Sequence, residues 1–460
     1  MPGVYFTTTE FLDDAKSAAK DRGMPGIRMI ALPADKYYRA RATQPELQPI
    51  AAAAFDQMAD DLIRPLTADE AKPSQIQKQK ENTNISVTGK DYQDAYQNVN
   101  DLFLDSHWAD GLPIVPPTPA LVKAMLAATT RSPDDVLGQV APKNGTATVE
   151  KIAVNSVMAG AKPEYFPVIL AAMDGFLDKH YDLTHVQAST GSFTPVVIVN
   201  GPIAKELDFN SGIGMLGHGW RANSTVGRAL RLSLLNLGQT WPAVNDMSLI
   251  GRLEAYTFFT FAEDEAKSPW EPYDVSLGFK PEDSTVTVAT SRDPQNLGGG
   301  AVAPWTAKGI LDTAAARALS ANVFGWVHSQ TFILVLHPDC AYELGKLGFT
   351  RKSLQEWLYE HTSIPYEKLV SATSGFGHAS EIEEIQQSIA DGRIRPDRAQ
   401  IFKDGLKPGG KVPIVQSPDD FHIVVAGGSP GYTLLFSYPG PNWANETKKI
   451  SGATLTKAGR

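Results

Sequence analysis

The glycine-rich segment FNSGIGMLGHGWRANSTVGRALR contains the residue types and spacing best suited to binding an anion. It is predicted to lead from a flexible loop into a helix capped by Asn223 or Ser224. The free N–H groups of a helix start attract anions, and an arginine fork can hold a carboxylate or phosphate through two hydrogen bonds. Arg221 lies at this start, and Arg228 and Arg231 share one face of the helix. The pattern predicts substrate binding by these side chains; arginines paired with acidic neighbours on a solvated helix are the alternative.

Two histidines are the candidate acid or base groups. His218 lies in the same glycine loop, and His185 lies in DLTHVQASTGSF, just ahead of a predicted buried strand. Imidazole titrates near neutral pH, which suits it to proton transfer. Thr190 and Ser192 in the same stretch are predicted to contact substrate, because α/β proteins commonly build sites where strands meet loops. A structural role is the alternative for each histidine.

A pair of carboxylates lies in a third segment, AYTFFTFAEDEAKSPWEP. If its strand continues, Glu263 and Glu265 project from the same face. Paired carboxylates can hold a hard cation or divide acid and base roles. His185, Asp246 and Glu263 form the candidate ligand set for a divalent ion such as Mg, Mn, Fe or Zn, although no H-x-x-x-H or H-E-x-x-H spacing supports it. A solvated acidic loop is the alternative.

Three further features have less predictive weight. Lys151 and Asn155 stand four residues apart on a mostly apolar predicted helix and are candidate substrate contacts. The glycines of GIGMLG fit G-x-G-x-x-G, but they come about ten residues after the nearest strand, which argues against a dinucleotide site. The single cysteine, Cys340, excludes an internal disulfide and a thiolate zinc cluster, and we expect it to be unreactive.

These residues require a scaffold of strands and helices in alternation. The chain has 460 residues, of which 42% are hydrophobic, enough for a packed core. Strongly β-branched and aromatic strands are predicted at 194–200, 255–263, 284–290, 331–337 and 421–428. Helices are predicted at 92–107, 118–128, 149–160, 163–179, 222–237, 301–320 and 350–361. The predicted fold class is α/β, with layered mixed sheets and flanking helices.

The first 65 residues are predicted to form a separate, partial Rossmann-like unit. It contains a helix at 8–21, a strand at 27–32 and a helix at 46–63. One strand cannot close a sheet alone, so this unit needs another part of the chain or another chain. The polar segment 66–91 is predicted to be a linker, and 92–460 to be the large body, possibly in two lobes.

Charge and composition exclude several classes of function. The net charge of -9 argues against a general nucleic-acid binder. No apolar run reaches the roughly 18–20 residues that span a bilayer. The start, MPGVYFTTTEF, lacks the basic and apolar blocks of a secretion signal, so we expect a cytoplasmic protein.

Several of these motifs together resemble the UGSC-type (seleno)protein family. They are ADGLPIVPPT, EKIAVNSVMAGAKPEYFPVILAA, VQASTGSFTPVVIVNGP, NSGIGMLGHGWRANSTVGRALRL, FAEDEAKSPWEP, GFTRKSLQEWLYEH and HIVVAGG. The similarity runs from about 92 to 428, and FLDDAKSAAKDRGMPGIRMIALPAD resembles the back half of the UGSC domain itself. The Cys-Gly-Ser-Cys motif that names the family is absent. The resemblance therefore implies a hetero-oligomer in which a second, smaller subunit completes the N-terminal unit.

The sequence favours a subunit of a hetero-oligomeric enzyme. The expected reaction is non-redox cleavage of a carbon–heteroatom bond, hydrolytic or eliminative and with or without a metal ion, in a small anionic or oxygenated organic molecule. One alternative is the large subunit of a thiol or selenol reductase whose partner carries the reactive Cys or selenocysteine. Another is a non-catalytic binding or scaffold subunit.

Overall fold

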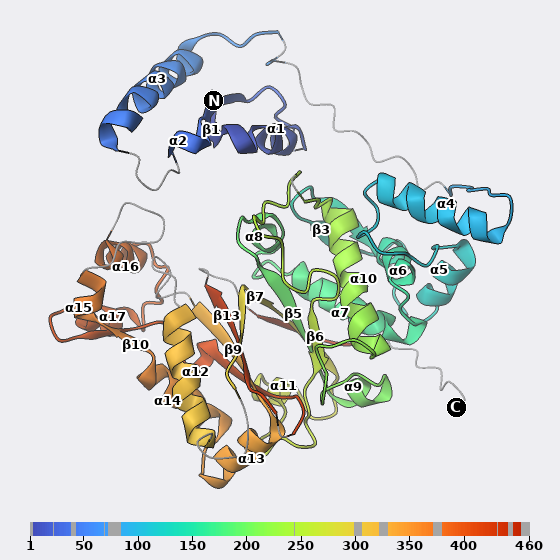
Figure 1. Cartoon of the computed structure of the whole chain (residues 1–460), viewed down its shortest axis with the longest axis vertical. Helices are drawn as coiled ribbons and strands as arrows, with labels where there is room; N and C mark the ends of the chain where they lie inside the picture. The colour runs from blue at the N-terminus through green and yellow to red at the C-terminus, as the bar shows by residue number, and fades with distance from the viewer. Residues whose placement is uncertain are drawn as a thin grey trace. The chain divides into compact units, whose positions relative to one another are not determined.

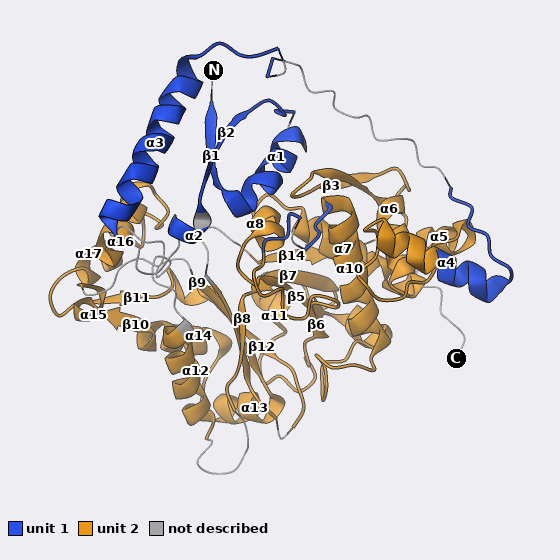
Figure 2. Cartoon of the chain, turned by 45° about the horizontal axis from the view of Figure 1, so that its top comes forward, with its two compact units in different colours: residues 1–98, 239–247 blue, residues 99–238, 248–460 orange. Residues whose placement is uncertain are grey.

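The computed structural model divides the chain into two compact units. Unit 1 comprises 1–98 and 239–247, and unit 2 comprises 99–238 and 248–460 (Figure 2). The structure describes residues 3–21, 23–37, 43–68, 70–71, 84–242, 244–298, 306–321, 330–370, 380–429, 431–439 and 445–451.

Unit 1 contains a β-α-β-α arrangement. Strands β1 (Val4–Thr8) and β2 (Arg28–Leu32) are parallel, and α1 (Leu12–Asp21) connects them. Helices α2 (Ala34–Tyr37) and α3 (Gln44–Ile63) follow. The prediction of a single strand was wrong, because the short β-forming run VYFTT precedes the first helix and pairs with β2.

The start of the predicted linker belongs to unit 1. The Glu70 carboxylate lies 3.0 Å from the Arg28 guanidinium and 2.8 Å from that of Arg64. These contacts fix the chain just beyond α3 to β2. Most of the remaining predicted linker, 72–83, lies outside the described residues.

Unit 2 is built on two four-stranded sheets. Their orders are β14-β7-β5-β6 and β12-β9-β13-β8. The strands of the unit are β3 (Val136–Val140), β4 (Gly145–Thr148), β5 (Thr194–Asn200), β6 (Phe259–Ala262), β7 (Thr285–Ser291), β8 (Asp293–Asn296), β9 (Gln330–Leu336), β10 (Ser363–Pro365), β11 (Lys411–Pro413), β12 (Phe421–Val425), β13 (Leu434–Pro439) and β14 (Glu446–Lys449).

Helices surround these sheets, and some of them pack on the outer sheet faces. They include α4 (Tyr92–Asp105), α5 (Pro119–Leu126), α6 (Val149–Met158), α7 (Phe166–Phe176), α8 (Leu183–Ala188), α9 (Pro202–Glu206), α10 (Arg221–Gly238), α11 (Tyr273–Ser276), α12 (Ala307–Ala321), α13 (Pro338–Lys346), α14 (Arg351–His361), α15 (Tyr366–Val370), α16 (Glu381–Ala390) and α17 (Ala399–Gly405). The division between the two units falls within α4. In Figure 1, α6, α7 and α10 lie on one side of the strands, and α12 and α14 lie on the other.

The alternation of side chains along β5 explains the layers. Val197 and Val199 pack in a core with α6, α7 and α10. Val196 and Ile198 point the other way, into a core shared with Val335 of the second sheet. The strand is therefore buried on both faces, as its uninterrupted apolar sequence predicts.

The two sheets have the same topology. In the first, β6 is parallel to β5, and β7 and β14 are antiparallel to their neighbours; β12, β9, β13 and β8 repeat this pattern. The fourth strands are exchanged, because β8 follows β7 in sequence but pairs with β13, and β14 follows β13 but pairs with β7. The two halves of unit 2 are therefore interlocked.

The predicted body elements agree with the structure, with one large boundary error. Strand 194–200 coincides with β5, and the predicted helices correspond to elements in the structure; of the 301–320 helix, only the part after residue 305 is described. The strand predicted at 255–263 is wrong before Phe259, because residues 253–257 form turns and Phe258 has a φ of 53°, outside the extended range. Among the described residues, no helix combines the length and apolar character needed to cross a bilayer.

Candidate functional site

A polar hollow of about 480 Å³ lies at the start of α10. Three segments of unit 2 line it: the turn after α6, the end of α9, and the entry to α10. The lining residues are Lys162, Glu164, Tyr165, Glu206, Leu207, Asp208, Gly219, Trp220, Arg221 and Ala222. We call this the Arg221 hollow, and its volume is in the range of small-molecule sites.

Local sequence explains how these segments turn toward one another. Gly219 has a φ of 106°, which only glycine adopts readily, and it delivers the chain into α10 at Arg221. Pro163 begins the 3-10 turn Pro163–Tyr165 that presents Glu164. The Arg221 guanidinium donates to the Gly160 carbonyl from Nε (3.2 Å) and Nη2 (2.9 Å), which ties α10 to this turn.

Charges of both signs surround the phenol of Tyr165. Burial raises the pKa of Tyr165, the Arg221 guanidinium opposes this rise, and the carboxylates of Glu164 and Asp208 add to it. The phenol therefore stays protonated near neutral pH and can donate a hydrogen bond. Glu164 Oε2 is buried and accepts no hydrogen bond from the described residues. His218 is exposed and immediately precedes Gly219 of the lining.

The Glu263 carboxylate lies outside this hollow, in a buried network at the ends of β5 and β6. Its side chain has no exposed surface, and it accepts from the Asn200 amide (2.6 Å) and the Tyr273 N–H (2.6 Å). The Arg351 guanidinium lies 3.4 Å away. Burial raises the pKa of Glu263, and Arg351 opposes this. Because substrate or metal cannot reach this carboxylate, we assign it a structural, positioning role: its contacts hold the two halves of unit 2 together.

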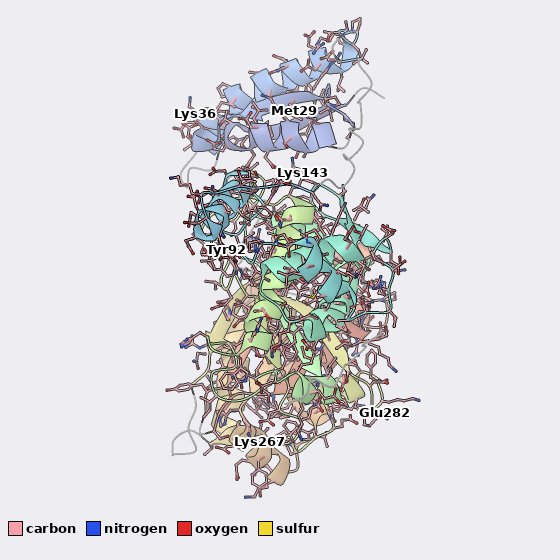
Figure 3. The ribbon with its side chains drawn as sticks, turned by 90° about the vertical axis from the view of Figure 1, so that its right-hand side faces the viewer. Met29, Lys36, Tyr92, Lys143, Lys267 and Glu282 are labelled. Carbon is pink, nitrogen blue, oxygen red and sulfur yellow. The ribbon has the colours of Figure 1, made fainter. Side chains whose placement is uncertain are left out.

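Glu265 contacts the same amide as Glu263. Its Oε1 accepts from Asn200 Nδ2 (3.1 Å) and from the Gly201 N–H (2.7 Å). The predicted proximity of the two glutamates is therefore present, although β6 ends at Ala262. Asp264 between them is buried and pairs, at 2.9 Å, with the exposed Lys267, which is labelled in Figure 3.

Two of the predicted anion-binding residues on α10 have other partners. Arg228 forms a two-pronged ion pair with Asp110, at 2.8 and 2.9 Å. Asn223 lies inside the helix, and its amide bonds the backbone of Asn210, Met215 and Thr260. The predicted cap at Asn223 was wrong because α10 begins at Arg221. Arg221 alone of the predicted clamp lines the hollow.

The backbone of the 187–193 segment is held by hydrogen bonds from one arginine. Arg252 donates to the carbonyls of Gln187, Ser189, Gly191 and Phe193. The predicted contact residues of this segment interact with the neighbouring loop 248–253. The carbonyl of Thr190 accepts from the Leu249 N–H, and the Ser192 hydroxyl lies 3.4 Å from that of Ser248.

His185 is exposed on α8. Its Nδ1 lies 3.2 Å from Asp182, whose oxygen also accepts the His185 N–H at the start of this helix. Asp246 is buried within unit 1, whereas His185 and Glu263 belong to unit 2. The group of possible metal ligands found among the described residues contains none of these three residues.

Lys151 and Asn155 take part in backbone contacts of α6. Lys151 Nζ donates to the Thr146 carbonyl at 3.1 Å, and the Asn155 amide donates to the Lys151 carbonyl at 2.8 Å. Asn155 Oδ1 accepts from Asn236 of α10 at 2.6 Å. These contacts join α6 to its neighbours.

A second hollow of about 480 Å³ is lined by residues 176–184 and by the β3–β4 hairpin, and it shares no lining residue with the Arg221 hollow. Asp178, which lines it, groups with His180 and Glu446 closely enough to offer three ligands to a metal. However, the Lys448 ammonium lies 2.5 Å from Asp178 and 3.1 Å from Glu446. The hydrogen bond from Lys448 lowers the pKa of Asp178 to about 2. This cluster already contains its cation.

Cys340 is buried at the start of α13. Burial raises the pKa of its thiol to about 12, and the hydroxyl of Thr433 opposes this rise. The thiol is therefore protonated at neutral pH, in agreement with the expectation that it is unreactive.

Several residues of the Arg221 hollow were missed from the sequence. Glu164 and Tyr165 lie in AKPEYF, which reads as an ordinary helix start, and Asp208 follows a short helix. Only Arg221 had a recognisable context. The φ of 57° at Asp208 is a conformation that few residues other than glycine adopt, but the sequence does not reveal it.

Comparisons with protein-family models, with curated proteins and with solved structures gave no match for this chain. The resemblance to the UGSC-type family stays a prediction, and function is argued below from the site.

Proposed function

We propose that this chain is the substrate-binding subunit of an enzyme that cleaves a carbon–heteroatom bond in a small anionic or oxygenated organic molecule, and that the Arg221 hollow holds this substrate. The observation that carries the proposal is a small-molecule-sized hollow in which a guanidinium, a protonated phenol and an unbonded carboxylate oxygen lie together. Binding, proton donation and proton abstraction are the functions that such groups perform.

The proposed roles follow from these groups. Arg221 and Lys162 hold the anionic part of the substrate. In an elimination, Glu164 takes a proton from the carbon beside the scissile bond, and that electron pair forms the new double bond. The heteroatom leaves with the electrons of the broken bond, and the Tyr165 phenol or the His218 side chain protonates it. In a hydrolysis, Glu164 instead takes the proton of the attacking water.

A divalent metal is not required by these roles, and the predicted metal ligands support it weakly. Glu263 is enclosed, and in the described group of possible ligands Asp178, His180 and Glu446 both carboxylates already contact the Lys448 ammonium. We therefore propose a reaction carried by side chains.

A smaller partner subunit is a separate proposal, favoured by unit 1. Among the described residues, β1 and β2 pair only with each other, and Tyr5 and Phe6 on β1 are 51% and 41% exposed. Two-stranded parallel sheets are rare because both faces need cover. A partner would also supply the thiol or selenol that the reductase alternative needs, since Cys340 is buried. Purification of the native complex, with mass spectrometry of chains and metals, tests partner and metal together.

The test of the substrate site is a comparison of two arginine variants. Purified wild-type protein, Arg221→Met and Arg317→Met would be titrated calorimetrically with small carboxylates, with turnover followed by mass spectrometry. Arg317 is exposed on α12 and is the matched control. We expect Arg221→Met to lose binding at least tenfold and Arg317→Met to match wild type. Equal binding by all three proteins would overturn the proposal.

A further inference from the structure

The charged side chains that line the Arg221 hollow lack ion-pair partners among the described residues. Two cationic residues, Lys162 and Arg221, and three carboxylates, Glu164, Glu206 and Asp208, line it. Among the described residues, none of the five forms an ion pair within 4 Å.

Three other arginines of unit 2 form ion pairs. Arg228, two turns further along α10, is paired with Asp110, and Arg351 is paired with Glu263. Arg131 is paired with Asp174 at 2.8 Å. The five charged side chains of the hollow have no such ion pairs among the described residues, and a bound molecule can neutralise them.

The balance of these charges restricts the chemistry of that molecule. Two cations against three carboxylates give the lining a net charge of -1. An anion alone would neutralise the cations but leave three carboxylates facing it, at a Coulomb cost that grows as water is displaced. A molecule that has a negative group and a positive group satisfies both.

Aromatic side chains complete a site for the positive group. Trp220 and Tyr165 both line the hollow, and Trp220 is 40% exposed. The faces of such rings attract ammonium groups, most of all N-methylated ones. The Arg221 guanidinium lowers the pKa of Tyr165, whereas the carboxylates of Glu164 and Asp208 raise it, so charges of both signs act on this ring.

We propose that the ligand of the Arg221 hollow is a dipolar ion, with a carboxylate held by Arg221 and Lys162 and an ammonium group held by Trp220, Tyr165 and the carboxylates of Glu206 and Asp208. This inference rests on the proposed function and narrows its substrate from anionic molecules to ammonium carboxylates. Both ends of the ligand remain bound while a bond between or beside them is cleaved.

The test uses two molecules of nearly the same shape. Glycine betaine is a dipolar ion, and 3,3-dimethylbutanoate replaces its charged nitrogen by carbon. Titration calorimetry of the full chain with each probe measures the contribution of the positive charge alone. We expect betaine to bind at least tenfold more tightly than dimethylbutanoate.

Two variants assign the effect to the site. Asp208→Asn should weaken betaine binding about fivefold or more, and it should not weaken the binding of dimethylbutanoate, because removing a carboxylate lowers the Coulomb cost of an anion. Asparagine tolerates the positive φ of this position, so the variant should fold. Asp312→Asn, at an exposed position of α12, is the matched control and should change the binding of neither probe. Arg221→Met should weaken both probes.

The outcomes separate the two proposals. Equal binding of the two probes, both lost in Arg221→Met, would overturn the dipolar ligand and keep the anion site. Binding of betaine that Asp208→Asn does not weaken would also overturn it. Binding of neither probe would overturn the dipolar ligand. If the wider carboxylate panel also fails to bind, the proposed function is overturned with it.

Discussion

Removal of Arg351 should destabilise unit 2 strongly. Its guanidinium is 6% exposed, donates to the carbonyls of Glu271 (2.6 Å) and Ile423, and lies 3.4 Å from the enclosed Glu263 carboxylate. At an effective dielectric constant of about 20, two charges at that distance attract by about 5 kcal/mol. Loss of one partner of a buried pair typically costs about 3–5 kcal/mol. We expect Arg351→Met to lower the free energy of unfolding by this amount.

Glu263→Gln should cost less, about 1–3 kcal/mol, because the amide can still accept from Asn200 and Tyr273. In the double variant both charges are removed, so no buried charge is left unpaired. Its loss of unfolding free energy should therefore be at least about 1.5 kcal/mol smaller than the sum of the losses in the two single variants.

The cost of Arg351→Met should also depend on pH. Burial raises the pKa of Glu263, and without Arg351 it rises further. An acid with a raised pKa in the folded state contributes stability that is present at low pH and lost as the pH rises through that pKa. The variant should therefore be closer to wild type at pH 5 than at pH 8.

Urea unfolding followed by tryptophan fluorescence measures these values, because all but Trp241 of the eight tryptophans fall within the ranges of unit 2. Arg393→Met is the control, because Arg393 forms a partly exposed ion pair with Glu384. This variant should lower the free energy of unfolding by about 1 kcal/mol or less. A cost below 1 kcal/mol for Arg351→Met, or additive single costs, would refute the positioning role of Glu263.

Three further predictions concern other sites. Burial lowers the pKa of His422, which lies beside the Tyr273 hydroxyl, to about 4. The neutral imidazole therefore contributes stability that is present above pH 6.5 and is lost as the pH falls toward 4. His422→Gln should flatten the acid side of a plot of stability against pH by up to about 3 kcal/mol, and an unchanged plot would contradict this. The Cys340 thiol, with its pKa of about 12, should react with a thiol reagent at pH 8 roughly a thousandfold more slowly than in urea-unfolded protein; a comparable rate would show that it is accessible. Arg228→Met should lower the free energy of unfolding by about 3 kcal/mol, because it leaves the Asp110 carboxylate unpaired, and it should not change ligand affinity at the Arg221 hollow. A loss of affinity with unchanged stability would instead support the predicted clamp of three arginines.

The sequence predicted the central strands well and the edges of the sheets poorly. All seven residues of β5 are buried, so its apolar run is unambiguous. β8 (DPQN) and β14 (ETKK) are short and polar, and each pairs with a strand from the other half of unit 2. Nothing in their local pattern indicates that long-range exchange.

The site was predicted in part for the same reason. Arg221 was found because a glycine loop and a helix start are visible in the sequence. Glu263 was noticed as a carboxylate, but its partner Arg351 is 88 residues away, and only the packed structure shows that the pair is enclosed. Asn223 has the side chain of a helix cap, yet its amide binds the backbone of the preceding loop.

Hydrogen–deuterium exchange with and without a bound carboxylate tests the Arg221 hollow most directly as the ligand site. The hollow is built from three segments far apart in sequence, 162–165, 206–208 and 219–222. A ligand that bridges them should slow exchange in all three together, and the effect should disappear in Arg221→Met. Protection confined to the second hollow at 176–184, or no protection in these three segments, would contradict the account.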